Sequence, residues 1–184
     1  MSLLRFLGLG GSSQPAGRPP EPESGDTDTV RRISAQLERL DPATAKYLAA
    51  FAYVLARVAH ADLSIDSDET SAMERIVSQL TDLAPEEASL VVEIAKSQAR
   101  LLGGTENYVV TREFRTISTR EQRGKLLECL YAVAAADGSI TGPESNEIVA
   151  IAEELGFTRP EANALRGEYR DKLSEFQSGG KGSP

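Results

Sequence analysis

The residues of this chain best suited to chemistry are carboxylates that lie within, or shortly after, two copies of one short sequence. The first copy reads Ala-Asp-Leu-Ser-Ile from position 61 and the second reads Ala-Asp-Gly-Ser-Ile from position 136, each with a glutamate shortly after it. Calcium and magnesium bind to several oxygen ligands, which carboxylates supply. The two copies therefore predict a site for a divalent cation, calcium or magnesium. Its candidate ligands are Asp62, Asp66, Asp68, Glu69, Asp137 and Glu144.

The second copy continues as Asp-Gly-Ser-Ile-Thr-Gly-Pro-Glu, which has the look of the second half of an EF-hand calcium loop. The first half of such a loop is missing. Its opening ligands would fall on Val133 and Ala135 in the second copy and on Val58 and His60 in the first, inside apolar helical patterns. An EF-hand is therefore excluded, and a metal site here would need backbone carbonyls, water or acids from both copies.

The same carboxylates also fit a role without metal. Thr141 and Glu144 have the spacing of a capping box, and Asp66 and Glu69 form its aspartate-started equivalent. The aspartate of each copy follows a helix, whose C-terminal dipole disfavours a negative charge. Either loop amides in an Asx-type turn or a bound cation would compensate that charge. The spacing leaves both interpretations open.

No arrangement of nucleophile and base typical of an enzyme is specified by spacing, and the chain has no glycine-rich phosphate loop. The single histidine, His60, is predicted on a solvated helix face shared with Tyr53 and Arg57. We therefore expect no enzymatic activity. A hydrolase with an unrecognised carboxylate site would require Asp62 and Asp137 to converge in space.

The elements that position these loops are predicted to be helices. Gly103 and Gly104 interrupt the helical pattern, and Tyr108–Val110, a short run of residues that favour strands, is predicted to be a loop. After it we expect helical segments at 112–117, 121–136, 144–155 and 159–176. The fold class is therefore all-α, a compact bundle of seven to eight helices built from two pseudo-repeated helix-loop-helix halves. The apolar residues at helical spacing before the break are Val30, Ile33, Leu37, Leu40, Tyr47, Phe51, Val54, Leu55, Val58, Met73, Ile76, Val77, Leu80, Leu90, Val91, Ile94 and Leu101.

Composition limits the classes of partner. The 184 residues carry a formal net charge of -8 with a pI near 4.8, which disfavours a nucleic-acid surface and favours cations or basic partners. Cys129, the single cysteine, lies among leucines at helical spacing, which predicts a core residue in a reducing compartment. The pairs Glu86–Glu87 and Glu153–Glu154 are predicted to be solvated helix faces.

The chain divides into three parts by composition. Residues 1–26 combine a short apolar N-terminus with a linker rich in Pro, Gly and Ser, residues 27–177 form the helical domain, and residues 178–184 form a flexible tail. The N-terminus is neither a signal peptide nor long enough to span a bilayer. It is predicted either to contact a membrane surface or partner, or to be a disordered end. Its apolar side chains are Leu3, Leu4, Phe6 and Leu7.

The two copies, together with the run Leu-Leu-Glu-Cys-Leu-Tyr-Ala-Val-Ala-Ala-Ala-Asp-Gly from Leu126, resemble the tellurite-resistance TerB family and the TerB-like domain of DjlA-type co-chaperones. The resemblance covers about residues 43–158 and departs at Leu63, where the motif prefers Gly. It implies a compact bacterial all-helical domain in the cytoplasm, with acidic residues that bind divalent metal and a role in stress-response assemblies near the inner membrane. The His-Pro-Asp motif of a J domain is absent from the chain.

The sequence thus predicts a non-enzymatic TerB-like stress-response module that recruits protein partners near the cytoplasmic face of the membrane. Its acidic loops are expected to bind a divalent cation. The alternative is a metal-free structural protein-interaction domain whose acidic loops only cap helices.

Overall fold

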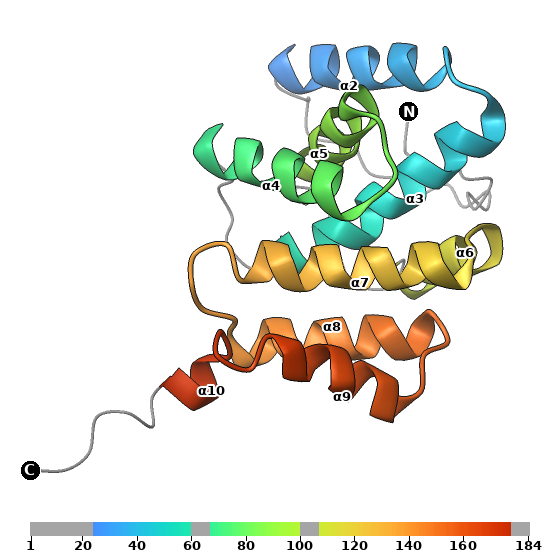
Figure 1. The fold of residues 1–184 in the computed structure, drawn as a ribbon. Coiled ribbons are helices and arrows are strands. Elements are labelled where there is room, and N and C mark those ends of the chain that lie inside the picture. Colours follow the sequence, from blue (N-terminus) through green and yellow to red (C-terminus); the bar gives the residue numbers. More distant parts are fainter. Residues whose placement is uncertain (1–23, 60–66, 100–106, 178–184) are drawn as a thin grey trace, which may run out of the picture.

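The computed structural model describes residues 24–59, 67–99 and 107–177 (Figure 1). In these ranges the chain forms nine helices and no strand, so the predicted all-α fold is confirmed. Within the same ranges, no helix is both long and apolar enough to cross a membrane. The helices are α2 (Ser24–Leu37), α3 (Pro42–Ala59), α4 (Ser67–Leu80), α5 (Pro85–Ala99), α6 (Asn107–Ile117), α7 (Arg120–Ala134), α8 (Gly142–Glu154), α9 (Arg159–Glu168) and α10 (Ser174–Gln177).

Helix α3 is the centre of the molecule. Asp41 starts it as an N-cap, with Oδ1 accepting hydrogen bonds from the amides of Ala43 at 3.1 Å and Thr44 at 3.0 Å. Every residue from 48 to 56 is buried, because α5, α6, α7 and α8 all pack against this helix (Figure 1). A helix that is apolar on all sides is typical of the middle of a bundle.

Aromatic side chains join α3 to α6. The ring of Phe114 packs edge-on to Phe51 at a centroid distance of 6.0 Å, and it lies 5.3 Å from the ring of Tyr47. Phe51 and Phe114 are fully buried. Cys129 on α7 is also fully buried, which confirms the prediction of a core residue, and burial raises the pKa of its thiol to about 12.

The internal repeat extends over three helices on each side. Adding 75, the offset between Asp62 and Asp137, to the residue numbers of α3, α4 and α5 gives 117–134, 142–155 and 160–174, which cover α7, α8 and all but the first residue of α9. Helix α4 packs on α5 as α8 packs on α9, and the first helices of the two units, α3 and α7, contact each other. The predicted two-halved architecture is therefore present, with α2, α6 and α10 added to it among the described residues.

The prediction of a loop at Tyr108–Val110 was wrong, because these residues lie in the first turn of α6. Val110 and Phe114 are one helical turn apart and both are fully buried against the core. Burial of this stripe overrides the local preference of the run for extended backbone.

The helix predicted over 159–176 is interrupted. Helix α9 ends at Glu168, and the chain then pairs with the loop before α8: the amide of Ile140 donates to the carbonyl of Lys172 at 2.7 Å, and that of Ser174 donates to the carbonyl of Ile140 at 2.9 Å. Residues 172–173 are therefore not helical, because the backbone groups of Lys172 and Ser174 are hydrogen-bonded to Ile140 and fix this loop. Helix α2, in turn, begins within the last residues of the predicted linker.

Candidate functional site

The first acidic copy lies largely outside the described residues. Asp62 and Asp66, as well as His60, are not among them. Asp68 and Glu69 belong to the first turn of α4, but their side chains lie outside the description. The metal-binding and capping roles predicted for this copy therefore remain predictions.

The second copy forms a defined turn between α7 and α8. Asp137 Oδ1 accepts a hydrogen bond from the amide of Ser139 at 2.9 Å. This is an Asx-type turn, one of the two ways of compensating the Asp137 charge that the sequence suggests, the other being a bound cation. Gly138 adopts φ 98°, a left-handed conformation that is strained for a residue with a side chain. The Asp137 residue is exposed, so its carboxylate faces solvent.

The predicted capping box of Thr141 and Glu144 is confirmed, with Thr141 as the N-cap of α8 and Glu144 in its first turn. Glu144 Oε2 accepts hydrogen bonds from the amide of Thr141 at 2.8 Å and from the hydroxyl of the same residue at 2.7 Å. The Glu144 amide in turn donates to Thr141 Oγ1 at 3.4 Å. One oxygen of this carboxylate is therefore occupied by the helix start itself.

Both flanks of this loop are anchored. Ile140 is fully buried and makes the backbone pairing with Leu173 described above. The side-chain amide of Gln177 on α10 donates to the carbonyl of Gly138 at 2.9 Å. The loop consequently presents the Asp137 carboxylate from a fixed backbone.

Asp137 and Glu144 are the two predicted ligands whose side chains the structure describes. In the described ranges, no group of three or more His, Cys, Asp or Glu side chains is placed to hold a metal ion. A hard cation needs about six to eight oxygen ligands. A complete site would therefore need further oxygen ligands, from backbone carbonyls, from water or from the acids of the first copy.

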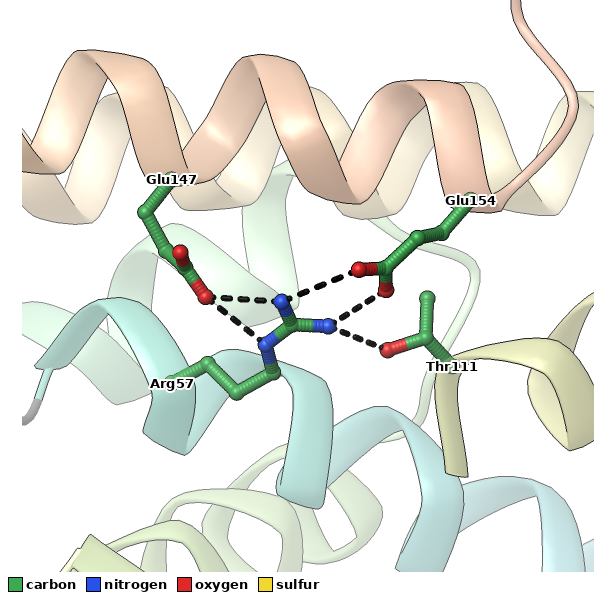
Figure 2. Close-up of polar contacts among 4 residues, drawn as sticks. All are labelled: Arg57, Thr111, Glu147 and Glu154. Carbon is green, nitrogen blue, oxygen red and sulfur yellow. Dashed lines mark hydrogen bonds and ion pairs between the residues drawn. The ribbon is translucent and has the colours of Figure 1, made fainter. Parts of the chain in front are cut away.

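A partly buried ionic cluster that the sequence reasoning missed joins the two halves (Figure 2). Arg57 of α3 points between two glutamates of α8. Its Nε and Nη2 donate to Glu147 Oε1 at 2.9 and 2.7 Å, and its Nη1 and Nη2 donate to Glu154 Oε2 and Oε1 at 2.6 and 3.3 Å. Nη1 also donates to Thr111 Oγ1 of α6 at 2.6 Å. All five N–H groups of the guanidinium are thus used.

The predicted solvated face with Arg57 and Tyr53 was wrong. The Arg57 side chain is only 5% exposed and Tyr53 is buried, because α8 covers that side of α3. Burial acts to lower the pKa of Arg57, but the hydrogen bonds to Glu154 and Glu147 outweigh it, and the pKa is raised. The charge attraction and the directed hydrogen bonds between the guanidinium and the two carboxylates together offset the cost of removing these charges from water.

Glu154 was also predicted to be solvated, yet its side chain is only 19% exposed and binds Arg57. The neighbouring Glu153 does face solvent and pairs with Arg159 at 3.3 Å. Glu86 is exposed, whereas Glu87 Oε2 accepts a hydrogen bond of 2.9 Å from the amide of Ala84, just before α5. A sequence signal did exist, because Glu147 and Glu154 are two helical turns apart on one face of α8.

One pocket, of about 330 Å³, lies at the other end of α7 from the acidic loop. Asp137 is not among its lining residues, so this pocket does not supply the converging aspartates that a hydrolase would require. Two of its lining residues, Lys125 and Asp82, form an ion pair with Nζ and Oδ2 2.5 Å apart. The lining residues are Ala43, Thr44, Tyr47, Thr81, Asp82, Leu83, Glu87, Ile117, Gln122 and Lys125.

Comparison with known proteins gives one result. The sequence model of a family described as tellurite resistance protein TerB matches residues 48–167, which is well over half of the 184 residues. The match spans both repeat units from α3 into α9. Neither the curated proteins nor the solved structures contain a match.

Proposed function

Because the chain belongs to the TerB family, we propose that it is a non-enzymatic stress-response module that recruits protein partners through its acidic loops. The observation that supports this role is the anchored loop of the second copy, which presents an exposed carboxylate from a fixed backbone. A rigid, solvent-facing acidic loop suits a cationic partner, because little conformational entropy is lost when the partner binds.

A divalent cation, calcium or magnesium, is the second part of the proposal. Asp137 and Glu144 each have one oxygen engaged in the turn or the cap, which leaves the other available. Asp62, Asp66, Asp68 and Glu69 would complete the ligand set. A cation shared by the two copies would also link partner recruitment to metal supply.

The test is thermal melting of the full chain with chelator, calcium or magnesium. We expect one cation to raise the stability of the parent by about 2.7 kcal/mol at 100 times its dissociation constant. The double variant Asp62→Asn, Asp137→Asn should lose this response, because an amide is a poorer ligand for a hard cation. Asp171→Asn, which neutralises another exposed aspartate, is the matched control and should keep it.

The metal-free interaction domain is the alternative, and the turn and capping box of the second copy favour it. It makes a different prediction for the same aspartate. Asn at position 137 keeps an oxygen that accepts the Ser139 amide, whereas Ala removes it. If no cation shifts the parent, Asp137→Asn melts like the parent and Asp137→Ala melts lower, the loop acts only as a turn and a protein contact.

Recruitment itself is measured by quantitative co-purification with the full chain as bait. Partners that bind through the acidic loops should be lost with Asp62→Asn, Asp137→Asn and retained with Asp171→Asn. Equal recovery with all three baits would refute recruitment through these loops. If the same partners are also lost when a chelator is added, the cation takes part in the same interaction.

Attachment at the cytoplasmic face of the inner membrane completes the proposal, with the apolar N-terminus as the contact. Deleting residues 1–11 is expected to leave the melting temperature unchanged and to reduce flotation with vesicles of phosphatidylglycerol and phosphatidylethanolamine. Serine at Leu3, Leu4, Phe6 and Leu7 is the control that keeps the length and should reproduce the loss. A fall in melting temperature would instead assign the segment to the folded domain.

A further inference from the structure

Three arginine side chains meet on the turn that joins α8 to α9. Arg115 of α6 packs against Gly156, where an added Cβ would lie 2.8 Å from its guanidinium carbon. Arg123 Nη1 of α7 donates to the carbonyl of Leu155 at 2.8 Å. The guanidinium carbon of Arg120 lies 4.7 Å from the ring centre of Phe157. Consecutive residues 155–157 thus each contact one guanidinium.

The charge of this cluster is not balanced by the residues that the structure describes. Arg120 pairs with Glu161, Arg123 donates to two backbone carbonyls, and Arg115 has no ion pair or hydrogen bond with a described residue. Among the described residues, these three positive groups therefore have one carboxylate partner. Burial lowers the pKa of Arg123, and the charges of Arg115 and Arg120 lower it further, as expected for neighbouring cations. This excess stands out in a chain of net charge -8.

The solvent face of α6 continues from this cluster. Tyr108, Arg112 and Arg115 follow one another at helical spacing, and Val109 lies beside them. Tyr108 is 55% and Val109 43% exposed, and Arg112 is exposed without a partner among the described residues. Exposed Tyr and Arg are the residue types that carry much of the binding energy in protein interfaces.

We propose that this α6 face, defined as Tyr108, Val109, Arg112 and Arg115 with Arg120 and Arg123 at its end, binds an acidic segment of a partner protein. Carboxylates of the segment pair with Arg112 and Arg115, and an apolar side chain of the segment packs on Tyr108 and Val109. Charge complementarity selects this occupant: the face is basic and suits carboxylates, whereas the negative charge of the whole chain disfavours nucleic acids.

The α6 face is separate from the acidic loops. It adjoins the start of α7, whereas the loop of the second copy follows the end of the same helix (Figure 1). A helix of 15 residues is about 22 Å long. The proposed cationic partner and the acidic segment therefore use different surfaces, and variants can remove either one alone.

The test is fluorescence anisotropy of the full chain with a fluorescein-labelled peptide of glutamate and aspartate that contains one leucine and one phenylalanine. We expect Arg112→Gln, Arg115→Gln to weaken binding about tenfold or more. Arg39→Gln, Arg75→Gln changes the net charge equally at exposed positions away from this face and should bind like the parent. Arg112→Gln alone is the second variant, because the Arg112 side chain is exposed and has no ion pair with a described residue, so we expect the fold to be unchanged.

Further outcomes support or overturn the proposal. A peptide with glycine in place of leucine and phenylalanine should bind the parent more weakly than the original peptide does. The Tyr108→Ser variant should bind the two peptides equally. No binding of the acidic peptide, or equal weakening by the Arg39 and Arg75 variant, would overturn the proposal. Tighter binding of a duplex DNA or of phosphatidylglycerol vesicles to the parent than to Arg112→Gln, without binding of the peptide, would assign the face to another class of ligand and overturn it too.

Discussion

Replacing Arg57 with methionine is expected to lower the free energy of unfolding by about 3–5 kcal/mol. The guanidinium is 5% exposed and neutralises Glu147 and Glu154, so its removal leaves two partly buried carboxylates facing each other without a cation. Methionine fills much of the same space, so the loss reports charge and hydrogen bonding more than volume. Urea unfolding followed by circular dichroism and by tyrosine fluorescence measures it.

Matched variants isolate the electrostatic part of this loss. Arg75→Met removes an exposed arginine of α4 and should change stability by less than about 0.5 kcal/mol. Adding Glu147→Gln and Glu154→Gln to Arg57→Met removes the unpaired charges and should restore part of the stability. A loss from Arg57→Met no larger than that of the control would refute the role of the cluster in joining the halves.

Phe114→Ala is expected to cost about 3–5 kcal/mol. Its ring is fully buried between Tyr47 and Phe51, so truncation removes apolar contacts to α3 and leaves a cavity at the junction of α3 and α6. The same urea unfolding measures the effect. Helix α6 should also lose protection from amide hydrogen exchange ahead of the rest of the fold, because this ring anchors it.

Phe176→Ala is the control of the same chemistry. Phe176 is 49% exposed, with the guanidinium of Arg170 over its ring, so its truncation should cost less than about 1 kcal/mol. Equal losses from the two phenylalanines would mean that α6 does not depend on the aromatic contacts with α3.

The sequence predicted well whatever is decided by neighbours along the chain. The helical stripes of α3 to α5, the core position of Cys129 and the capping box of Thr141 and Glu144 all follow from spacing within a few turns. The repeat offset then identified the two halves. These signals are local, so no knowledge of packing was needed.

The errors arose where distant residues decide the local structure. Tyr108–Val110 is helical because Val110 and Phe114 are buried together, and α9 stops early because Leu173 pairs with Ile140. The partners of Arg57 are 90 and 97 residues away in the chain. A polar residue on a central helix can only be told from one on a surface helix when its partners are known.

The ionic cluster also shows how far the two repeats have diverged from interchangeable units. The repeat offset relates Arg57 to Ala132, Glu147 to Ala72 and Glu154 to Gln79. Two copies of the first unit would therefore bury guanidiniums without carboxylates, and two copies of the second would supply carboxylates without a guanidinium. Although the chain carries an internal duplication, its halves behave as the unlike subunits of a heterodimer, each complementary to the other and neither to itself.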